Sequence, residues 1–275
     1  MPYALFETRV EADVMQGSVA IVTGGGTGIG AATVRRLAAR GVSCVINYAS
    51  SRDDAQALAH EVGHGAIVVQ ADIVEDAACR RLVAEAVDCF GRVDSLVNNA
   101  GRTKFAAHED LDALDAADFV DVYQLNVIAA FQMIRAAAPA LRQSTHGAVV
   151  NVASVAGVFG IGSSVAYAAS KGALITMTKS LARVLSPAIR VNAVAPGYVG
   201  TGWFEKRLSE EGFAKLNAKI AAATPMALAT GPDEVAASIE MLLDPAMRAI
   251  TGEVMLVDAG AHLDVGLSRR PGREN

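Results

Sequence analysis

Tyr167 and Lys171 are four residues apart in the run Tyr-Ala-Ala-Ser-Lys, so on a helix both side chains emerge from one face about a turn apart. A free tyrosine ionises near pH ~10 and is a poor base at neutrality. A fixed ammonium beside it favours the phenolate and lowers the pKa of the phenol. The pair therefore predicts a tyrosine that exchanges protons near pH 7, although this spacing also occurs by chance.

Ser154 stands thirteen residues before Tyr167, at the end of the apolar run 148–153. That run is typical of a buried strand, which would deliver its last side chains to the edge of a sheet. There the Ser154 hydroxyl could hold a substrate oxygen. Residues 147–170 carry no charge and are long enough for a membrane-spanning helix. However, interruptions by Gly, Ser and Asn favour a strand, a loop and then the helix that bears Tyr167.

A glycine-rich turn follows the first apolar strand-like run, residues 19–22. Gly24, Gly28 and Gly30 fit the pattern T-G-x-x-x-G-x-G, and helix-like residues 31–39 come next. Glycine permits a tight turn and a close backbone approach to a pyrophosphate, and a helix N-terminus offers free N–H groups with partial positive charge. The Lys-Ser/Thr pair of a nucleotide-triphosphate loop is missing. The turn predicts a dinucleotide site, with a simple flexible loop as the alternative.

With these two motifs, the chain resembles the short-chain dehydrogenase/reductase family over about residues 17–260. The resemblance includes Asn98-Asn99-Ala100-Gly101 after the strand-like residues 93–97, Asn126, the spacing of Ser154 to Tyr167, and Pro196-Gly197 after the run 190–195. It implies reduction of a ketone, or oxidation of a secondary alcohol, by hydride exchange with a nicotinamide cofactor.

The apolar runs near 19–23, 43–48, 66–70, 93–97, 148–153, 189–195 and 253–257 alternate with Ala-rich helical stretches. This alternation predicts an α/β fold: a Rossmann-like, doubly wound parallel sheet of about seven strands with helices on both faces. In such sheets ligands bind beyond the carboxyl ends of the strands. The 275 residues are 52% hydrophobic and carry no Pro/Ser-rich linker, so we expect a single domain, 1–275, with a core of about 17–260 and mobile or subunit-contacting extensions.

Charge and cysteine usage limit the function classes. The formal net charge is −5 with no basic run, so neither a nucleic acid nor a membrane is an expected partner. Cys44, Cys79 and Cys89 lack the spacing of a disulfide framework or metal site, so we expect reduced, mostly buried thiols and no metal. The first ten residues do not read as a secretion signal, and a cytoplasmic location is expected.

The resemblance also implies a role for each residue of the catalytic set. Tyr167 would give its proton to the substrate oxygen while Ser154 holds that oxygen. Lys171 would stabilise the tyrosinate and bind the nicotinamide ribose, and Asn126 would hold a water that connects Lys171 to solvent. Asn126 is otherwise an ordinary helix-interior asparagine in need of a hydrogen-bonding partner. The cofactor contacts implied are Gly24, Thr27, Gly28, Ile29, Gly30, Asn47, Tyr48, Ser50, Ser51, Arg52, Asp72, Ile73, Asn99, Ala100, Gly101, Tyr167, Lys171, Pro196, Gly197, Val199 and Thr201.

The end of the second strand bears on the choice between NADP and NAD. A carboxylate there would bind the adenosine ribose and repel a 2′-phosphate, but no acid lies near Asn47 or Tyr48. Ser50, Ser51 and Arg52 follow and could hold a phosphate. The sequence therefore favours NADP over NAD. The alternative interpretation of Arg52 is a solvated surface charge that does not contact the cofactor. Asp72 resembles the family's adenine contact, and a helix N-cap is its other interpretation.

The sequence says least about the identity of the substrate. Trp203 and Phe204 open a variable segment, 202–224, and Phe159 and Ile161 lie between Ser154 and Tyr167, so all four are candidates for an apolar pocket. A 3-oxoacyl thioester, a sugar and a steroid remain open as the carbonyl or alcohol compound. The alternatives to a reductase are a non-catalytic dinucleotide sensor and a related epimerase or dehydratase. By resemblance we also expect a homotetramer or homodimer, paired through the helices that carry Asn126 and Tyr167.

Overall fold

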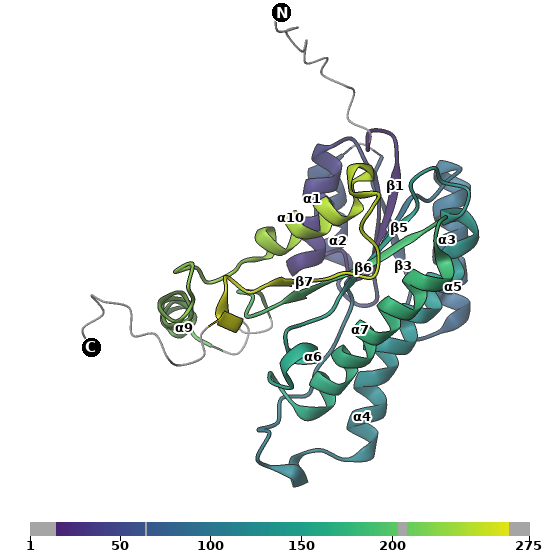
Figure 1. Cartoon of the computed structure of the whole chain (residues 1–275). Helices are drawn as coiled ribbons and strands as arrows, with labels where there is room; N and C mark the ends of the chain where they lie inside the picture. Colours follow the sequence, from purple (N-terminus) through teal and green to yellow (C-terminus); the bar gives the residue numbers. More distant parts are fainter. Residues whose placement is uncertain (1–14, 64, 203–207, 264–275) are drawn as a thin grey trace, which may run out of the picture.

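The computed structural model describes residues 15–63, 65–202 and 208–263, which form a seven-stranded parallel sheet between two layers of helices (Figure 1). The strand order is β3-β2-β1-β4-β5-β6-β7, so the winding direction reverses between β1 and β4. The predicted doubly wound α/β fold is confirmed, and each predicted strand is present to within two residues at its ends. The strands are β1 (Val19–Val22), β2 (Ser43–Tyr48), β3 (Ile67–Gln70), β4 (Ser95–Asn98), β5 (Ala148–Val152), β6 (Arg190–Pro196) and β7 (Val254–Val257).

Helices cover both faces of the sheet (Figure 1). One layer consists of α1 (Gly28–Ala39), α2 (Arg52–Val62) and α10 (Pro232–Leu243), and the other of α3 (Asp76–Phe90), α5 (Ala130–Leu141) and α7 (Val165–Leu185). Two short helices, α4 (Ala116–Tyr123) and α6 (Ala156–Phe159), extend below the sheet in this view, and α9 (Glu210–Ala223) lies apart at its left edge. Among the described residues no helix is both long and apolar enough to cross a membrane.

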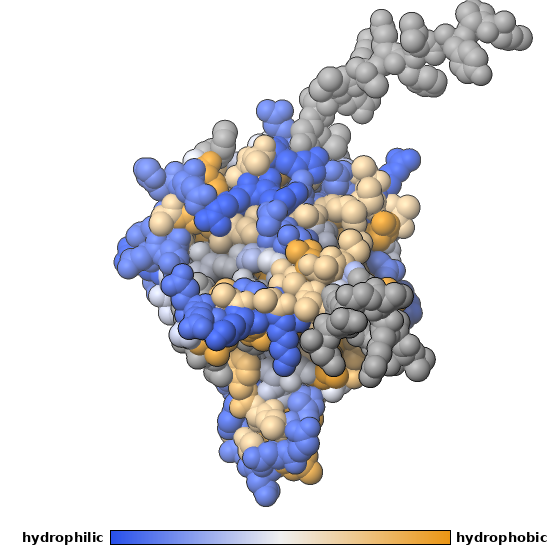
Figure 2. All heavy atoms as spheres, turned by 90° about the vertical axis from the view of Figure 1, so that its left-hand side faces the viewer, coloured by the Kyte–Doolittle hydropathy of each residue, from blue (hydrophilic) through white to orange (hydrophobic). Residues whose placement is uncertain are grey.

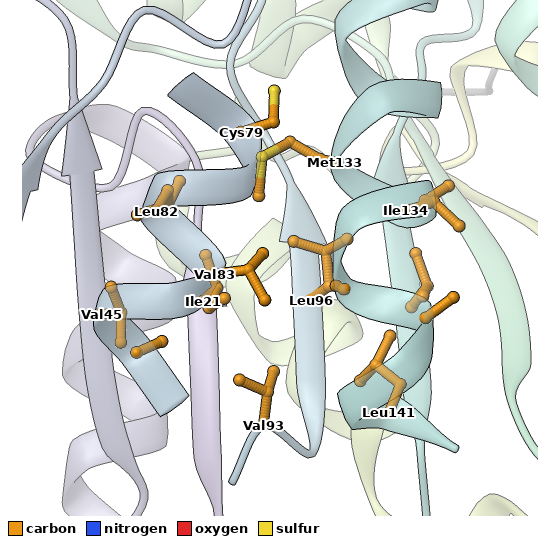
Figure 3. Close-up of a cluster of buried hydrophobic side chains, with 14 of the residues drawn as sticks. Ile21, Val45, Cys79, Leu82, Val83, Val93, Leu96, Met133, Ile134 and Leu141 are labelled. Carbon is orange, nitrogen blue, oxygen red and sulfur yellow. The ribbon is translucent and has the colours of Figure 1, made fainter. Parts of the chain in front are cut away.

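The sheet is buried on both faces because its strands are continuously apolar. Along β1, Val19 and Ile21 join the cluster under α3 and α5, whereas Ala20 and Val22 join the cluster under α1, α2 and α10. Successive side chains of a strand point to opposite faces, so one apolar run serves both cores. Figure 3 shows the first of these clusters, in which Leu82 and Val83 of α3 and Met133, Ile134 and Leu141 of α5 surround Ile21, Val45 and Leu96 of the strands.

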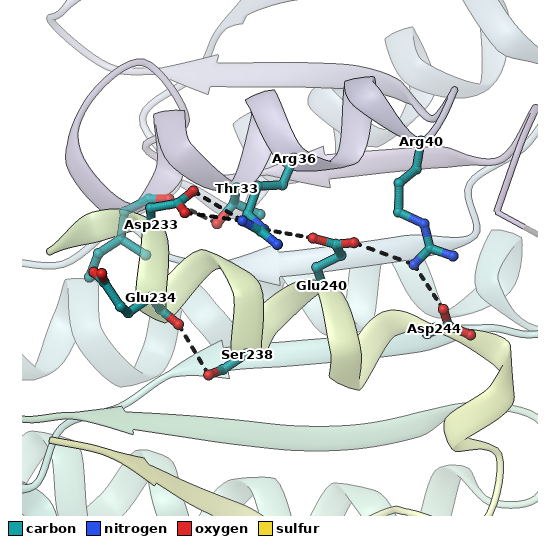
Figure 4. A network of polar contacts seen from close by, with 9 residues as sticks. Thr33, Arg36, Arg40, Asp233, Glu234, Ser238, Glu240 and Asp244 are labelled. Carbon is teal, nitrogen blue, oxygen red and sulfur yellow. Dashed lines mark hydrogen bonds and ion pairs between the residues drawn. The ribbon is translucent and has the colours of Figure 1, made fainter. Parts of the chain in front are cut away.

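The two outer helices α1 and α10 are joined by a row of ion pairs (Figure 4). Arg36 lies between Asp233 and Glu240, at 3.1 and 2.6 Å, and Arg40 donates to Asp244 at 2.8 Å. The carboxylates of Glu240 and Asp244 are mostly buried, so these pairs are less screened by solvent than ordinary surface pairs. The network fixes α10 along α1 on the outside of the molecule, away from the candidate site.

The element that carries Asn126 departs from the predicted helix. Residues Gln124–Ala129 form a π-helical turn between α4 and α5. Such turns are rare and occur frequently at functional sites. The extra residue in the turn places the Asn126 side chain 1% exposed beside the loop that follows β4.

Candidate active site

A cavity of about 1320 Å³ lies at the carboxyl edge of the sheet and runs from the glycine turn to Tyr167. It is placed where parallel α/β sheets bind ligands, next to the β1/β4 reversal. Most of the predicted site residues line it: Gly24, Thr27, Gly28, Ile29, Asn47, Tyr48, Ser50, Ser51, Asp72, Ile73, Asn99, Ala100, Gly101, Ser154, Tyr167, Lys171, Pro196, Gly197, Val199 and Thr201. Gly30, Arg52, Asn126 and Phe159 are not among its lining residues, and Trp203 and Phe204 lie outside the described residues.

The glycine turn is fixed from the neighbouring strand. The Asn99 side-chain amide donates to the carbonyls of Thr23 and Gly24, at 2.9 and 3.0 Å, and the Thr23 hydroxyl accepts from the N–H groups of Asn99 and Ala100. A Cβ at Gly30 would lie 2.4 Å from the Gly24 carbonyl oxygen, so Gly30 serves the turn itself and does not face the cavity. Gly24 has a φ of +58°, which favours glycine.

The start of α1 fits a phosphate group. Its N-cap residue Thr27 makes no side-chain capping hydrogen bond, and no acidic residue occupies the first turn. A Cβ at Gly28, whose φ is +53°, would meet only the Thr201 side chain, 3.6 Å away. The glycine thus leaves the backbone open towards the cavity, where the helix N-terminus offers N–H donors and partial positive charge. The residues present therefore fit the diphosphate of a dinucleotide.

The end of β2 differs in part from the prediction. The Asn47 side chain is 2% exposed and donates to the Ala71 carbonyl at 3.0 Å, so it joins β2 to the end of β3 besides lining the cavity. Ser50 and Ser51 reach the cavity. Arg52 begins α2 as an exposed residue outside the cavity lining, whereas Asp54, which sequence reasoning gave no role, belongs to that lining.

Asp72 lies on the cavity wall after β3. Its carboxylate accepts from the Val74 N–H at 3.1 Å and forms a local turn. The N-cap of α3 is Glu75, so the alternative interpretation of Asp72 as the helix cap is wrong. The carboxylate remains near the cavity as a candidate acceptor for an adenine amino group.

Ser154 and Tyr167 meet inside the cavity. Ser154 follows β5, is 8% exposed and accepts from the Ala156 N–H at 3.1 Å. Tyr167 is in the first turn of α7, whose N-cap Ser164 accepts from the Tyr167 N–H. Burial raises the pKa of Tyr167 to about 12, and a hydrogen bond with Ser154 acts in the opposite direction. The two hydroxyls can therefore contact one substrate oxygen.

The predicted lowering of the Tyr167 pKa by Lys171 is not seen. Lys171 is 4% exposed, donates to the Val152 carbonyl at 2.8 Å, and has its Nζ 5.7 Å from the centre of the Tyr167 ring. Burial lowers the pKa of Lys171 itself to about 8. In this arrangement desolvation is the largest influence on the pKa of Tyr167, and the hydrogen bond with Ser154 offsets only part of it. The sequence indicated the shared helix face correctly but not the degree of burial.

Asn126 lies behind Lys171 and not on the cavity wall. Its side chain accepts from the Arg102 N–H at 2.9 Å and donates to the Arg102 carbonyl and the Ser170 hydroxyl, each at 3.0 Å. Gly101 is placed between the two, because a Cβ there would lie 3.2 Å from Asn126 Oδ1 and 3.5 Å from Lys171 Nζ. Asn126 thus positions the loop after β4 next to the lysine.

Two features of the site escaped sequence reasoning. Asn98 donates to Asn151 at 2.9 Å, and Asn151 donates to Thr178 at 2.9 Å, a buried chain that joins β4 and β5 to α7 two turns beyond Lys171. Polar residues within the apolar run 148–153 were the available signal. The second feature is the stacking of Phe159 on His262, with ring centres 6.4 Å apart, which takes Phe159 out of the cavity lining. Ile161 lines the cavity, as expected.

Comparisons with known proteins agree with this geometry. The family described as enoyl-(acyl carrier protein) reductase matches residues 24–262. The chain is 42% identical over 251 residues to "Granaticin polyketide synthase putative ketoacyl reductase 2" of Streptomyces violaceoruber, covering 91% of this chain and 98% of the relative. It is 38% identical over 248 residues to the 3-oxoacyl-[acyl-carrier-protein] reductase of a Synechocystis strain, covering 88% and 96%.

A solved structure shows the same fold. A crystal structure from Burkholderia xenovorans, described as a "putative short-chain dehydrogenase/reductase", superposes with a TM-score of 0.82 at 40% identity, covering 90% of this chain and 98% of that one. These relatives match nearly their whole length, and the cavity joins the glycine turn to the Tyr167 set. The chain therefore belongs to the short-chain dehydrogenase/reductase family of oxidoreductases.

Proposed function

We propose that the protein reduces the carbonyl group of a small molecule to a secondary alcohol, with NADPH as the preferred cofactor and Tyr167 as the proton donor. The observation that carries the proposal is the single cavity that holds both the open N-terminus of α1 and the Ser154–Tyr167 pair. When bound there, a nicotinamide supplies a hydride to the carbonyl carbon. The protein supplies the proton and the positions of the groups.

Each member of the catalytic set has a separate task. The raised pKa of Tyr167 keeps its hydroxyl protonated at neutral pH, as a proton donor requires. Ser154 holds the carbonyl oxygen beside that hydroxyl and stabilises the negative charge that develops on it. Lys171 sits under the tyrosine ring, where a protonated amine stabilises the tyrosinate left after proton transfer. Asn126, through Arg102 and Ser170, keeps the neighbouring loop and α7 in register.

The substrate proposed is a 3-oxoacyl thioester or a ketone of similar shape. The cavity wall includes Phe105, Ala106, Ala107, Ile161 and Gly162, which offer no charge to a sugar phosphate or a carboxylate. The ketoacyl and 3-oxoacyl reductases among the relatives support this choice. Arg102 also reaches the cavity, but it forms an ion pair with Asp121 of α4.

The preference for NADP rests on the end of β2. Ser50 and Ser51 reach the cavity and no acid ends the strand, which suits a 2′-phosphate. Asp54 opposes this preference, because its carboxylate is part of the lining and repels a phosphate. Replacing Asp54 by Asn should therefore tighten NADPH binding more than NADH binding. Arg52→Ala should weaken NADPH selectively if the guanidinium turns to the phosphate, and an equal loss for both cofactors would contradict that contact.

We propose that two or four copies assemble through the helices that carry Asn126 and Tyr167. Large apolar side chains are exposed along this part of the surface: Phe119, Val120 and Tyr123 of α4, Ile128 of the π-turn and Phe131 of α5. A monomer rarely leaves such a set uncovered, and a two-fold axis would pair it with its own copy. Size-exclusion chromatography at several concentrations measures the assembly, and Val120→Asp should shift it towards the monomer.

The test of the function is an absorbance assay of nicotinamide oxidation with a panel of carbonyl compounds, run with NADPH and NADH in parallel. We expect turnover of short 3-oxoacyl thioesters with a lower KM for NADPH. A protein that binds NADPH tightly but turns over none of the panel would instead be a sensor. Conversion of a hydroxy compound without a net change in NADPH would indicate an epimerase or dehydratase.

A further inference from the structure

Tyr198 connects the cavity to the helix α9. It follows Gly197 directly and forms part of the cavity wall. Its hydroxyl points out of that wall and donates to Asn217 Oδ1 at 2.7 Å, in the middle of α9. Burial raises the pKa of Tyr198, so the phenol stays protonated and remains a donor over the working pH range. One side chain thus contacts both the ligand space and the helix outside it.

The inner face of α9 lies on the segment that carries Tyr198. A Cβ at Gly200 would come within 3.4 Å of Asn217 Oδ1 and 3.5 Å of the Phe213 ring. Phe213 and Asn217 are one helical turn apart, so both lie on the face that meets this segment. A Cβ at position 200 would make only ordinary contacts there, so this face of α9 packs directly against the segment. The hydrogen bond to Asn217 adds a directional contact that orients the helix.

Within the described part of the chain, the helix α9 is weakly buried. None of its residues is fully buried, and its Lys215–Glu211 ion pair is exposed to solvent. The segment after it is better attached, because the Thr224 hydroxyl bonds to the backbone of Leu228 and the Met226 N–H donates to the Ala259 carbonyl. On the cavity side, the Gly200 N–H donates to the Thr230 carbonyl at 3.0 Å. The wall and the end of α9 are thus attached near the carboxyl ends of β6 and β7. Among the described residues, the middle of α9 is held by the hydrogen bond to Asn217 and by the packing of its face on Gly200.

We propose that Tyr198 determines how large a substrate the enzyme accepts. Its ring forms part of the wall, and its hydroxyl, through Asn217, holds α9 against the outside of that wall. A bulky acyl group that displaces the ring must break the bond to Asn217 or move α9, whereas a short acyl group leaves both in place. This inference rests on the proposed carbonyl reduction, because it assigns the size limit of that same site.

The kinetic test compares two N-acetylcysteamine thioesters, acetoacetyl as the short probe and 3-oxododecanoyl as the bulky one. A hydrogen bond contributes about 0.5–1.5 kcal/mol net, or roughly 2- to 12-fold. In Tyr198→Phe and Asn217→Ala we therefore expect KM for the bulky probe to fall about 3- to 10-fold. The kcat values for both probes and KM for the short probe should change less than about twofold. Equal changes for both probes, or a change in kcat alone, would overturn the proposal.

Hydrogen exchange of the backbone amides tests the same bond without turnover, so it separates this inference from the proposed function. Tyr198→Phe and Asn217→Ala should each speed exchange in residues 210–223 about 3- to 10-fold, and the double variant should show no further increase. Exchange in α10 should stay unchanged. Asn217→Asp keeps an acceptor oxygen and should restore protection, and Lys219→Ala, on the exposed side of α9, should have no effect. Additive effects in the double variant, or normal protection in both single variants, would show that the bond does not position α9.

Discussion

Ser164 and Ser209 do the same task in two regions of the molecule. Each is an N-cap whose hydroxyl accepts a backbone N–H three residues on, Tyr167 for α7 and Gly212 for α9, at 3.2 and 3.1 Å. The two helices that these serines begin differ in how deeply they are buried. Eight residues of α7 are buried, Lys171 among them, whereas α9 has no buried residue. The same capping bond thus begins one helix that is packed into the core and one whose residues are all at least partly exposed in the described structure.

This difference matches the two tasks of the proposed enzyme. Proton transfer needs groups fixed to within a fraction of an ångström, and the buried α7 provides that for Tyr167 and Lys171. Substrate choice needs a surface that can change without disturbing the chemistry, and the region of α9 provides it. Figure 2 shows the face that carries α9, where hydrophilic and hydrophobic residues are interspersed over the surface. Substitutions in the two regions should therefore have effects of different size and kind.

The largest effect is expected from Tyr167→Phe. Removal of the hydroxyl takes away the proposed proton donor, so kcat should fall about 100- to 10,000-fold. NADPH affinity, measured by fluorescence titration, should change less than about threefold, because the ring and its packing remain. Tyr123→Phe is the matched control: it removes a hydroxyl from the proposed assembly surface of α4 but keeps the apolar ring, so it should keep full activity. Retained turnover in the Tyr167 variant would remove it from the catalytic set.

Gly30→Ala tests whether the glycine turn at the proposed cofactor site is as closely packed as α7. The new Cβ would lie 2.4 Å from the Gly24 carbonyl oxygen, so the turn must shift. Overpacking of this kind costs about 1–3 kcal/mol of stability, and NADPH binding should weaken more than about tenfold through the distorted turn. Gly91→Ala, at the end of α3 with a φ of +75°, should also lower Tm but leave NADPH binding intact. Unchanged NADPH affinity in Gly30→Ala would contradict the turn's assigned role.

Lys171→Met measures how much the burial of the Lys171 ammonium lowers the free energy of unfolding. Burial lowers the pKa of Lys171 from 10.5 to about 8, which corresponds to about 3 kcal/mol. Below pH 8 the folded wild type carries the full cost of a buried ammonium, and this cost disappears as pH rises to 10.5. The wild type should therefore gain stability relative to the variant between pH 8 and 10.5, as measured by denaturant unfolding. A constant difference over that range would mean that the amine is not buried as a cation.

The smallest effects come from the two caps themselves. Ser164→Ala should lower the free energy of unfolding by about 1 kcal/mol and reduce kcat, because the cap positions the turn that carries Tyr167. Ser209→Ala should change global stability by less than about 0.5 kcal/mol and affect hydrogen exchange only within α9. Equal losses of global stability in the two variants would show that α9 belongs to the same cooperative unit as α7.

The sequence predicted the fold well because the strands are continuous apolar runs and the chemistry lies at their ends. The strand before Ser154 and the glycine turn after β1 were both predicted from local residues, and the structure brings them to one cavity. The contact of Gly30 with the cofactor stays a prediction. The sequence did not reveal that a Cβ at this position would collide with the Gly24 carbonyl, because that contact is set by three-dimensional packing.

Features that depend on distant contacts were not predictable. Asn99 holds the glycine turn from 75 residues away. Asp54, and not Arg52, lies on the cavity wall, which the order of residues in the first turn of α2 does not reveal. The pKa of Tyr167 was predicted to fall, since the spacing reveals the neighbouring lysine but not the burial that raises the pKa of the phenol. The bond between Tyr198 and Asn217 joins a loop to a helix and leaves no local pattern in the sequence.

The most direct test of the central claim is isotope transfer by the wild-type protein. NADPH carrying deuterium on the transferable side of nicotinamide C4 would be mixed with acetoacetyl-N-acetylcysteamine, and the product analysed by mass spectrometry. We expect one deuterium on the carbinol carbon of the 3-hydroxy product, with transfer lost in Tyr167→Phe. A wild-type protein that binds NADPH and this thioester but forms no deuterated alcohol would contradict it.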